Sequence, residues 1–352
     1  MKANYILITL TLFFTVISCS SEEGVESKEI NDSAILNDSK DALDTIRMAL
    51  DWSPNVLHAG IFYADHSGLL KENGIYLDWF TTEVDNYQKK PIQRLLDREV
   101  DLAVGPSEHL FFYGDTIDQN YAVAIATLLQ KDQSAFVVKK RSGIASPKEL
   151  NGKVYVGYKT PLEQEILSAM IKNDGGDGEF ISITPPRLDA WDAFLNDKGH
   201  SAWVFSHWEG ALAANEDVEL NYFYPNKFGV PYGYSSVIMA NKKRRKTQKQ
   251  VIERFLKVMN IAHKELADKE ASEVVEMLKE YSDHENFKNT EFVTKAWLNI
   301  KDAFLNEAGQ WGKMSDEKWT NYYNWIIKND ALDFNKDIKD VGVYYEHLSI
   351  LE

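Results

Sequence analysis

The chain has 352 residues, 44% of them hydrophobic, and a formal net charge of −15 at pH 7. This excess of acidic residues argues against nucleic acid and anionic membrane surfaces as partners. Cys19 is the single cysteine, so the rest of the chain has no internal disulfide, no cysteine metal site and no thiol nucleophile.

The N-terminal segment has the features of a lipoprotein leader. Residues 5–17 are almost wholly apolar and follow Lys2. This run is too short to span a membrane comfortably and has the length of a signal-peptide core. It ends in Ser18-Cys19, which resembles the lipobox of bacterial lipoproteins, where the chain is cut before a cysteine whose sulfur carries a diacylglycerol. We predict a signal peptide over residues 1–18 and lipidation of Cys19; the alternative is an ordinary signal peptide that contains a cysteine.

The segment after the leader is polar. Residues 19–45 are largely Ser, Glu, Asp, Asn and Lys, and such a segment cannot bury enough apolar surface to fold. We predict a disordered tether there. About 305 residues follow it, and at roughly 100–200 residues per domain they predict two lobes.

Strands and helices alternate in the first part of the folded chain. The hydrophobic pattern predicts strands over residues 45–50, 75–80 and 100–104, and helices over 57–73 and 90–98. This alternation predicts a parallel sheet covered by helices.

A second alternation follows. It predicts strands over residues 135–139, 153–157, 181–184 and 202–205, a helical turn over 146–150, and helices over 160–173 and 188–195. The helix over 160–173 has a clear start: Thr160 is its N-cap, Pro161 suits the first helical position, and Glu163 completes a capping box with Thr160.

The last third of the chain is predicted to be nearly all helical. A strand over residues 236–240 is expected to return to the first lobe, and helical periodicity dominates from residue 247. The basic cluster at 242–246 is interpreted as the solvated start of a helix.

The sequence offers binding residues rather than catalytic motifs. It contains no Walker loop, no Gly-x-Ser-x-Gly elbow, no His-Glu-x-x-His and no Gly-x-Gly-x-x-Gly, so we predict no catalytic residue, no metal site and no cofactor. Polar and aromatic residues gather where strands end, and in open α/β sheets ligands bind beyond the carboxyl ends of the strands. The candidate ligand residues in these positions are Trp52, Asn55, His58, Ser107, Glu108, His109, Thr160, Pro161, Trp208 and Glu209.

The segment after the first predicted strand suits a planar heteroaromatic ligand, because Trp52 supplies a flat apolar face while Asn55 and His58 supply hydrogen-bonding edges. The segment at Thr160-Pro161 begins a predicted helix, and the free amides of a helix start are able to hold an anion or a carbonyl oxygen.

Residues 50–55, Leu50-Asp51-Trp52-Ser53-Pro54-Asn55, together with His58 and Gly60, resemble the opening motif of the thiamine-pyrimidine binding family. That family includes importer receptors for formylaminopyrimidine and hydroxymethylpyrimidine precursors, and the eukaryotic pyrimidine synthase. Further matching segments follow in the same order, and the likeness covers about residues 46–345. They are Thr160-Pro161-Leu162-Glu163, Asp174-Gly175-Gly176-Asp177, His207-Trp208-Glu209-Gly210 and Phe228-Gly229-Val230-Pro231.

The resemblance implies a type II periplasmic-binding-protein fold, which is an α/β architecture of two lobes joined by two hinge strands. Residues 46–138 and 236–352 would form the first lobe, with a helical C-terminal region, and residues 139–235 the second.

The resemblance also implies roles for several side chains. Trp52 would stack on the ligand ring, with Asn55 and His58 on the same wall. Glu209 would accept hydrogen bonds from a ring amine, and the Thr160-Pro161 helix start would hold a polar substituent. The aromatic residues Tyr232 and Tyr234 would lie near the cleft.

The sequence disfavours the synthase reaction. In the synthase a lysine that carries pyridoxal phosphate stands four residues before a histidine; His109 occupies a comparable place here, but Gly105 stands four residues earlier. The synthase's cysteine-rich loop corresponds roughly to residues 230–237, which contain no cysteine. Without an amine for the aldimine and without thiols, this chemistry has no reacting groups. We therefore predict that the protein is not an enzyme.

The sequence leaves alternatives open for the identity of the ligand and for the role in transport. His207 and Ser206 depart from the receptor pattern, so another small heterocycle is an alternative ligand. Sulfonate receptors share the fold, although Glu108 and Glu209 disfavour an anion. We expect a monomeric, extracytoplasmic protein, lipid-anchored to a bacterial membrane, that delivers its ligand to an ABC permease and ATPase; a sensor without a transporter is the other interpretation.

Overall fold

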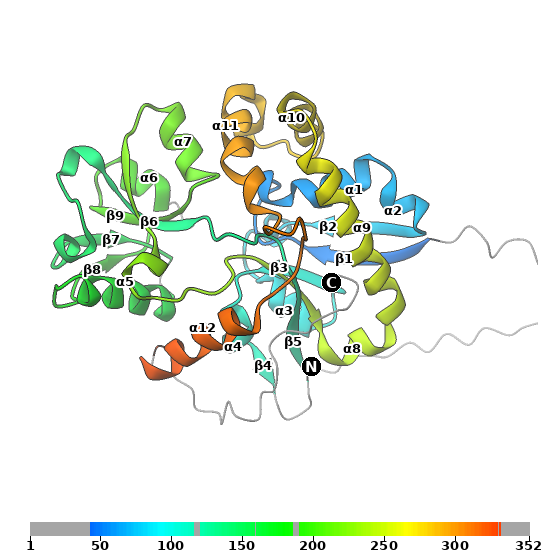
Figure 1. Cartoon of the computed structure of the whole chain (residues 1–352), viewed down its shortest axis with the longest axis horizontal. Coiled ribbons are helices and arrows are strands. Elements are labelled where there is room, and N and C mark those ends of the chain that lie inside the picture. The colour runs from blue at the N-terminus through cyan, green and yellow to red at the C-terminus, as the bar shows by residue number, and fades with distance from the viewer. Residues whose placement is uncertain (1–42, 116–119, 159, 186–189, 330, 332–352) are drawn as a thin grey trace, which may run out of the picture. The chain divides into compact units, whose positions relative to one another are not determined.

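The computed structural model describes residues 43–115, 120–158, 160–185, 190–329 and 331 (Figure 1). The predicted signal peptide, Cys19 and nearly all of the tether lie outside the described residues. The described residues, from 43 onward, belong to one compact unit. Within the described part of the chain, no helix combines the length and the apolar character that crossing a membrane requires.

The first sheet has six strands in the order β2-β1-β3-β11-β5-β4. β1 pairs in parallel with β2 and β3, whereas β11 runs antiparallel to β3 and β5. The predicted parallel arrangement therefore holds for β1, β2, β3 and β5, whereas the return strand β11 and the short β4 run in the opposite direction. The strand bounds are β1 Asp44–Ala49, β2 Ile75–Phe80, β3 Leu102–Gly105, β4 Gly114–Asp115, β5 Asn120–Thr127 and β11 Val237–Asn241.

The predicted helix over residues 57–73 is three shorter elements. They are the 3-10 turn η2 (Val56–His58), α1 (Ala59–His66) and α2 (Leu69–Glu72). Gly68 breaks the run with φ of +81°, a conformation that glycine adopts without a steric cost. The predicted helix over 90–98 is α3 (Pro91–Leu96), and a short α4 (His109–Phe112) follows β3.

The second sheet has five strands in the order β10-β6-β9-β7-β8. Its first strand in the chain, β6, pairs with β9 and β10, so the change of sheet falls between Thr127 and Ser134 rather than at residue 138. The bounds are β6 Ser134–Lys139, β7 Val154–Val156, β8 Ile181–Ile183, β9 Ser201–Phe205 and β10 Leu220–Phe223, with helices α5 Pro161–Asn173, α6 Ala190–Leu195 and α7 Glu209–Asn215.

The chain passes between the two sheets twice. We call residues 128–133 the first crossing and residues 224–236 the second crossing, since they join β5 to β6 and β10 to β11. The two lie side by side where the Leu128 amide donates to the Ser236 carbonyl at 3.0 Å. These two connections are those that a type II periplasmic-binding-protein fold requires.

The C-terminal region is helical, as predicted. Its helices are α8 Lys242–Thr247, α9 Lys249–Ala267, α10 Ala271–Glu280, α11 Thr290–Ile300 and α12 Asp316–Lys328. The predicted assignment of this whole region to the first lobe does not describe α12. Tyr322 and Ile326, both fully buried, belong to the apolar core of the second sheet together with Phe136 and Tyr155.

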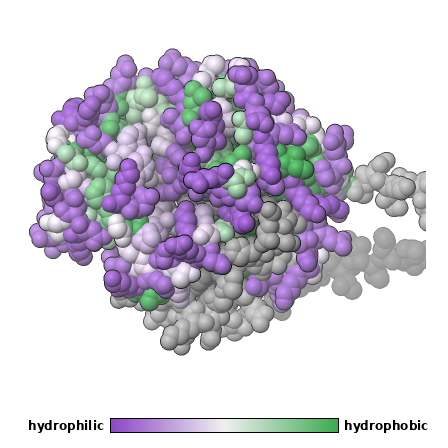
Figure 2. Space-filling model, in the orientation of Figure 1, coloured by the Kyte–Doolittle hydropathy of each residue, from purple (hydrophilic) through white to green (hydrophobic). Residues whose placement is uncertain are grey.

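The visible surface is mainly hydrophilic, with small scattered apolar areas (Figure 2). The exposed large apolar side chains come from separate elements, as Tyr76 of β2, Ile181 of β8 and Leu298 of α11 illustrate. Such isolated apolar residues are usual on a protein surface and mark no interface by themselves.

Candidate ligand site

The first predicted site residue, Trp52, lies in the loop after β1. It is half-buried, and its ring centroid lies 5.2 Å from that of Tyr87 at an interplanar angle of 43°. Glu83 connects the two loops, because it accepts hydrogen bonds from the Ser53 hydroxyl at 2.6 Å and the Tyr87 hydroxyl at 3.4 Å. The Trp52 ring is therefore held beside a second aromatic ring that sequence analysis did not single out.

Backbone strain marks the segment that carries Tyr87. Asn86 and Tyr87 have φ of 57° and 63°, and two successive non-glycine residues in this region are uncommon. Strain of this kind concentrates at functional sites. The sequence gives no sign of it, since the positive φ depends on the turn from η3 (Thr82–Asp85), where the Tyr87 amide donates to the Thr82 carbonyl at 2.9 Å.

Asn55 and His58 are occupied within the chain. His58 is fully buried; its Nδ1 accepts the Asn55 amide at 3.3 Å and its Nε2 lies 2.9 Å from Asp51 Oδ1. An Nδ1 that accepts is unprotonated, so Nε2 carries the proton that Asp51 receives. The Asn55 side chain accepts the Leu57 amide and donates to the Ser53 carbonyl. These groups shape the loop that presents Trp52.

Asp51 joins this loop to the second crossing. Its carboxylate accepts the Ser236 hydroxyl at 3.2 Å as well as His58. Burial alone would raise the pKa of Asp51, but the hydrogen bonds from His58 and Ser236 help to lower it below its ordinary value. Asp51 is therefore an anion that ties the Trp52 loop to the segment between the sheets.

Ser107, Glu108 and His109 follow β3. Ser107 is fully buried; its amide donates to the Tyr234 carbonyl at 3.1 Å and its hydroxyl accepts the Tyr234 amide at 3.2 Å. His109 is held neutral, since burial and the nearby Lys90 lower its pKa to about 3. Its Nδ1 is buried and has no hydrogen-bond partner among the described residues.

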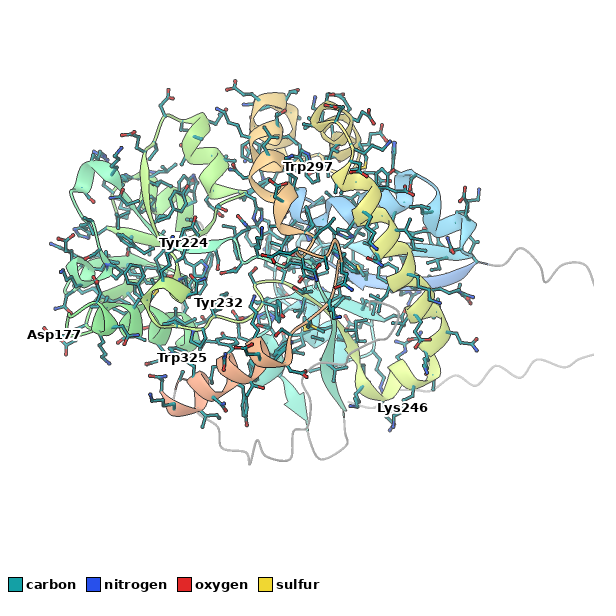
Figure 3. All side chains as sticks on the ribbon, viewed as in Figure 1. Asp177, Tyr224, Tyr232, Lys246, Trp297 and Trp325 are labelled. Carbon is teal, nitrogen blue, oxygen red and sulfur yellow. The ribbon has the colours of Figure 1, made fainter. Side chains whose placement is uncertain are left out.

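Glu108 points toward the second crossing. Both of its carboxyl oxygens lie 3.3 Å from the Tyr232 hydroxyl. Burial, together with the charges of Asp132 and Glu163, raises the pKa of Glu108 to about 7 against the opposing hydrogen bonds from its own backbone and from Tyr232. The Tyr232 ring packs edge-on against Trp203 at 5.3 Å, and Figure 3 labels it on the path from β10 to β11.

The Thr160-Pro161 helix start is satisfied by its own glutamate. Thr160 caps α5 by accepting the Glu163 amide at 3.2 Å, with Pro161 at the first helical position. Glu163 in turn accepts the amides of Tyr158 at 3.0 Å and Thr160 at 3.3 Å, and also the Tyr155 hydroxyl. The carboxylate of the chain thus occupies the helix start that sequence analysis offered to an anion.

Trp208 and Glu209 follow β9. The Trp208 ring packs edge-on against Phe292 of α11 at 5.0 Å and so contacts the core of the first sheet. Glu209 is half-buried and accepts the Phe205 amide at 2.8 Å. Burial raises the pKa of Glu209 to about 7, and its charge raises the pKa values of the Tyr158 and Tyr222 phenols.

Tyr234, a predicted site residue, and His207, which precedes Trp208, are both buried but differ in their hydrogen bonding. Tyr234 is buried and its hydroxyl accepts the Ser315 amide at 2.8 Å, so that residue anchors α12. His207 is buried beside Asp51 and His58; burial lowers its pKa to about 3, and its Nδ1 has no hydrogen-bond partner within the described residues.

The structure places two kinds of group after strand ends. The aromatic pair of Trp52 and Tyr87 lies in loops of the first sheet, while the half-buried carboxyls of Glu108 and Glu209 follow β3 of the first sheet and β9 of the second. The described ranges contain no group of three or more His, Cys, Asp or Glu side chains that could hold a metal ion. The arrangement suits recognition of a ring that carries hydrogen-bond donors.

The ionisation of Glu209 predicts a pH-dependent effect on stability. Its folded-state pKa of about 7 lies above the ordinary 4.5, so the folded state binds this proton more strongly and stability is lost as the pH rises from 4.5 through 7. Glu209→Gln removes the ionisation. We expect the variant to exceed the wild type in unfolding free energy by about 1–3 kcal/mol near pH 8 and to match it near pH 4.5.

Differential scanning calorimetry at both pH values measures this difference. Glu216→Gln is the matched control, because Glu216 is exposed just after the same helix, α7, and its loss is expected to change little at either pH. A Glu209→Gln variant that is less stable than the wild type near pH 8 would contradict the burial cost.

Comparison with known proteins agrees with this architecture. A family model described as NMT1/THI5 like matches residues 55–271. The chain is 23% identical over 301 residues to the formylaminopyrimidine-binding protein of Halalkalibacterium halodurans, an alignment that covers 83% of this chain and 88% of that protein.

Solved structures share the fold at low sequence identity. The alkanesulfonate-binding protein SsuA of Xanthomonas axonopodis pv. citri, bound to MOPS, superposes with a TM-score of 0.62 at 12% identity and covers 86% of this chain and 98% of its own. The desulfurization enzyme DSZB superposes with a TM-score of 0.56 at 13% identity, over 88% of this chain and 97% of its own. The fold is that of periplasmic binding proteins, and it hosts both receptors and an enzyme.

Proposed function

The chain belongs to the NMT1/THI5-like family, and from that premise we propose that it is the extracytoplasmic substrate-binding protein of an ABC importer. Its ligand is a thiamine-precursor pyrimidine of the formylaminopyrimidine or hydroxymethylpyrimidine type. The protein performs no reaction on the ligand; it captures it between its two sheets and delivers it to a membrane permease driven by an ATPase.

One observation carries this proposal: the Trp52 ring and the Glu209 carboxyl come from different sheets, and both are half-buried. A pyrimidine has a flat face for the first and amine donors for the second. A ligand that satisfies both sheets favours the state in which they are closed around it. The 23% identity to a formylaminopyrimidine-binding protein supports the same ligand class.

The enzyme alternative has little support from this chain. Gly105 stands where the synthase carries its cofactor lysine, and a Cβ there would lie 3.1 Å from His109 Nδ1. The nearest atom to such a Cβ would be Met239 Cε at 3.0 Å, so a side chain at this position would require both neighbours to shift. Glycine at this position supports binding without chemistry.

A ligand screen of the chain beginning at Ser20 tests the proposal. Formylaminopyrimidine, hydroxymethylpyrimidine, thiamine and an alkanesulfonate are compared by thermal shift and then by calorimetry. A ligand with a dissociation constant near micromolar raises the melting temperature when present in large excess. Binding of a pyrimidine is the expected result; binding of the sulfonate alone would assign the receptor to the other ligand class.

Glu209→Gln is expected to weaken pyrimidine binding by about 1–3 kcal/mol, because an amine donor then faces a neutral amide instead of a carboxylate. Calorimetry with formylaminopyrimidine measures the loss, again with Glu216→Gln as the control. Unchanged affinity would remove Glu209 from the site.

The proposed membrane anchor predicts the location of the protein in cells. Cys19→Ala removes the sulfur that would carry the lipid, so the variant is expected to appear in the soluble fraction while the wild type partitions into membranes. Fractionation and detergent phase separation measure this. Persistent membrane partitioning of the variant would refute lipidation at Cys19.

A further inference from the structure

We infer that Glu108 is the centre of a second carboxyl subsite, which binds a positively charged amine of the ligand. The subsite is formed by Glu108, Asp132, Tyr232 and Tyr322, and it is separate from Glu209. The inference rests on the proposed function, since it specifies the charge of the ligand that the site accepts.

Three separate segments meet at this subsite, and the charge of a fourth acts on it. Glu108 follows β3, Tyr232 lies on the second crossing and Tyr322 on α12, while Asp132 of the first crossing acts on Glu108 through its charge. The Tyr232 and Tyr322 rings are 5.4 Å apart at an angle of 74°. Their grouping depends on the path of the chain between the sheets, so ligand bound here would contact every connection between them.

The Glu108 carboxyl has capacity for a further donor. The Tyr232 hydroxyl lies at 3.3 Å from each of its two oxygens, which is long for an O–H···O bond and shares one proton between two acceptors. An ionised carboxylate has about four acceptor positions. The neighbouring charges that act on Glu108 most strongly, Asp132 and Glu163, are both negative.

Tyr322 supplies the independent sign of a ligand. Its side chain is fully buried, and its hydroxyl has no hydrogen-bond partner within the described part of the chain. Burial raises the pKa of this phenol, and the charges of Glu108 and Asp132 raise it as well; its ring packs against Tyr232, whose hydroxyl donates to Glu108. Buried hydroxyls are nearly always paired, and a donor bound to Glu108 would also reach the Tyr322 oxygen.

Asp132 has polar partners that Glu108 lacks. Burial raises the pKa of Asp132, but the Ser134 hydroxyl, which donates to it at 2.9 Å, and the charge of Lys318 from α12 oppose that rise. The Lys318 ammonium lies 4.0 Å from the centroid of the Tyr234 ring. The chain thus contains its own example of an ammonium over an aromatic ring of the second crossing, two positions from Tyr232.

These features select the chemical class. Two phenol rings and an uncompensated carboxylate attract an ammonium or amidinium group, and the surrounding negative charge repels sulfonate and phosphate. Among pyrimidines of the proposed type, the subsite therefore favours one that carries an amine protonated at neutral pH, bound at Glu108, in addition to the ring amine that Glu209 accepts.

The test compares two probes on the wild type and on Glu108→Gln by calorimetry at pH 7. One probe is formylaminopyrimidine, whose formamide is neutral; the other is its deformylated form, which carries a free amine. We expect the amine to bind the wild type at least about tenfold more tightly, and Glu108→Gln to abolish this preference while formylaminopyrimidine affinity changes by less than about threefold. Glu219→Gln, at an exposed carboxyl beside β10, is the matched control.

Each other outcome decides the matter. Equal affinity for the two probes, or a preference that survives Glu108→Gln, overturns the subsite and leaves pyrimidine binding intact. Failure of both probes to bind the wild type overturns the proposed function and this inference with it.

A second measurement needs no variant. Because Glu108 must ionise to bind an ammonium and its pKa is about 7, the preference for the amine is expected to rise about tenfold per pH unit from about pH 5.5 to 7 and then to level off. The other groups that face Glu108 are Asp132 and Glu163, whose pKa values are raised, and the phenols of Tyr232 and Tyr322. A preference that does not change with pH overturns the subsite.

Discussion

Trp52→Ala is expected to weaken pyrimidine binding by about 10–100-fold while leaving the unfolding free energy nearly unchanged. Stacking of a heteroaromatic ring on an aromatic side chain is worth about 1–3 kcal/mol by alanine substitution. The fold depends little on this ring, since Trp52 lies in a loop and is half-buried rather than part of an apolar core. Calorimetric titration with formylaminopyrimidine measures the affinity, and thermal unfolding without ligand measures stability.

Tyr76→Ala is the control for an aromatic side chain of the same sheet, because Tyr76 is 55% exposed on β2. It is expected to leave the affinity unchanged. Unaltered affinity in Trp52→Ala would remove the stacking role of Trp52. A parallel loss in Tyr87→Ala would extend that role to the pair, because the two rings lie 5.2 Å apart.

Gly60→Ala is expected to destabilise the fold by about 1–3 kcal/mol, although alanine is normally the better helix former by about 1 kcal/mol. Gly60 lies in α1, and a Cβ there would come 2.1 Å from His263 Nε2 of α9. The His263 ring has no room to move, because it stacks on Trp311 at 4.4 Å and its Nδ1 lies 2.8 Å from the Met259 carbonyl oxygen.

A double-mutant cycle separates this clash from other effects. His263→Ala removes the ring that the new methyl group would meet. The loss of unfolding free energy in the double variant is therefore expected to be smaller than the sum of the losses in the two single variants, by about 1 kcal/mol or more. Denaturant unfolding measures all four proteins. Strict additivity would show that the cost of Gly60→Ala arises elsewhere.

The Gly60 result also explains one position of the sequence motif. Sequence analysis placed Gly60 in the opening motif beside Trp52 and interpreted the segment as ligand-binding. The structure adds a packing reason, the close approach of α9 to α1. His58 of the same motif is likewise an internal group, fully buried against Asp51. The residues of this motif thus divide into Trp52, which the proposed ligand would contact, and those whose side chains pack or bond within the chain.

Local periodicity predicted most elements to within one or two residues. The alternation of apolar residues located β2 and β9, and the capping box located the start of α5. It missed β5, whose residues 120–127 read Asn-Tyr-Ala-Val-Ala-Ile-Ala-Thr. Residues 122–126 of this strand are fully buried apolar residues, and a short run of this kind does not distinguish a strand from a buried helix.

What the sequence by itself determined is the set of strand ends and their chemistry, because these depend on residues close together in the chain. Trp52, Glu108 and Glu209 were found in this way. Their ionisation was not, because the raised pKa values of Glu108 and Glu209 come from burial among distant residues.

Only the tertiary structure decided which groups meet. Tyr87 pairs with Trp52 through a strained turn, and Tyr322 of α12 packs against Tyr232, which donates to Glu108. Glu108 and Tyr322 are more than 200 positions apart in the sequence. No local sequence pattern predicts that residues so far apart in the chain lie in one region. Their proximity follows from the two crossings between the sheets and from the packing of α12 against the core of the second sheet. Burial of the apolar face of α12 determines where that helix lies.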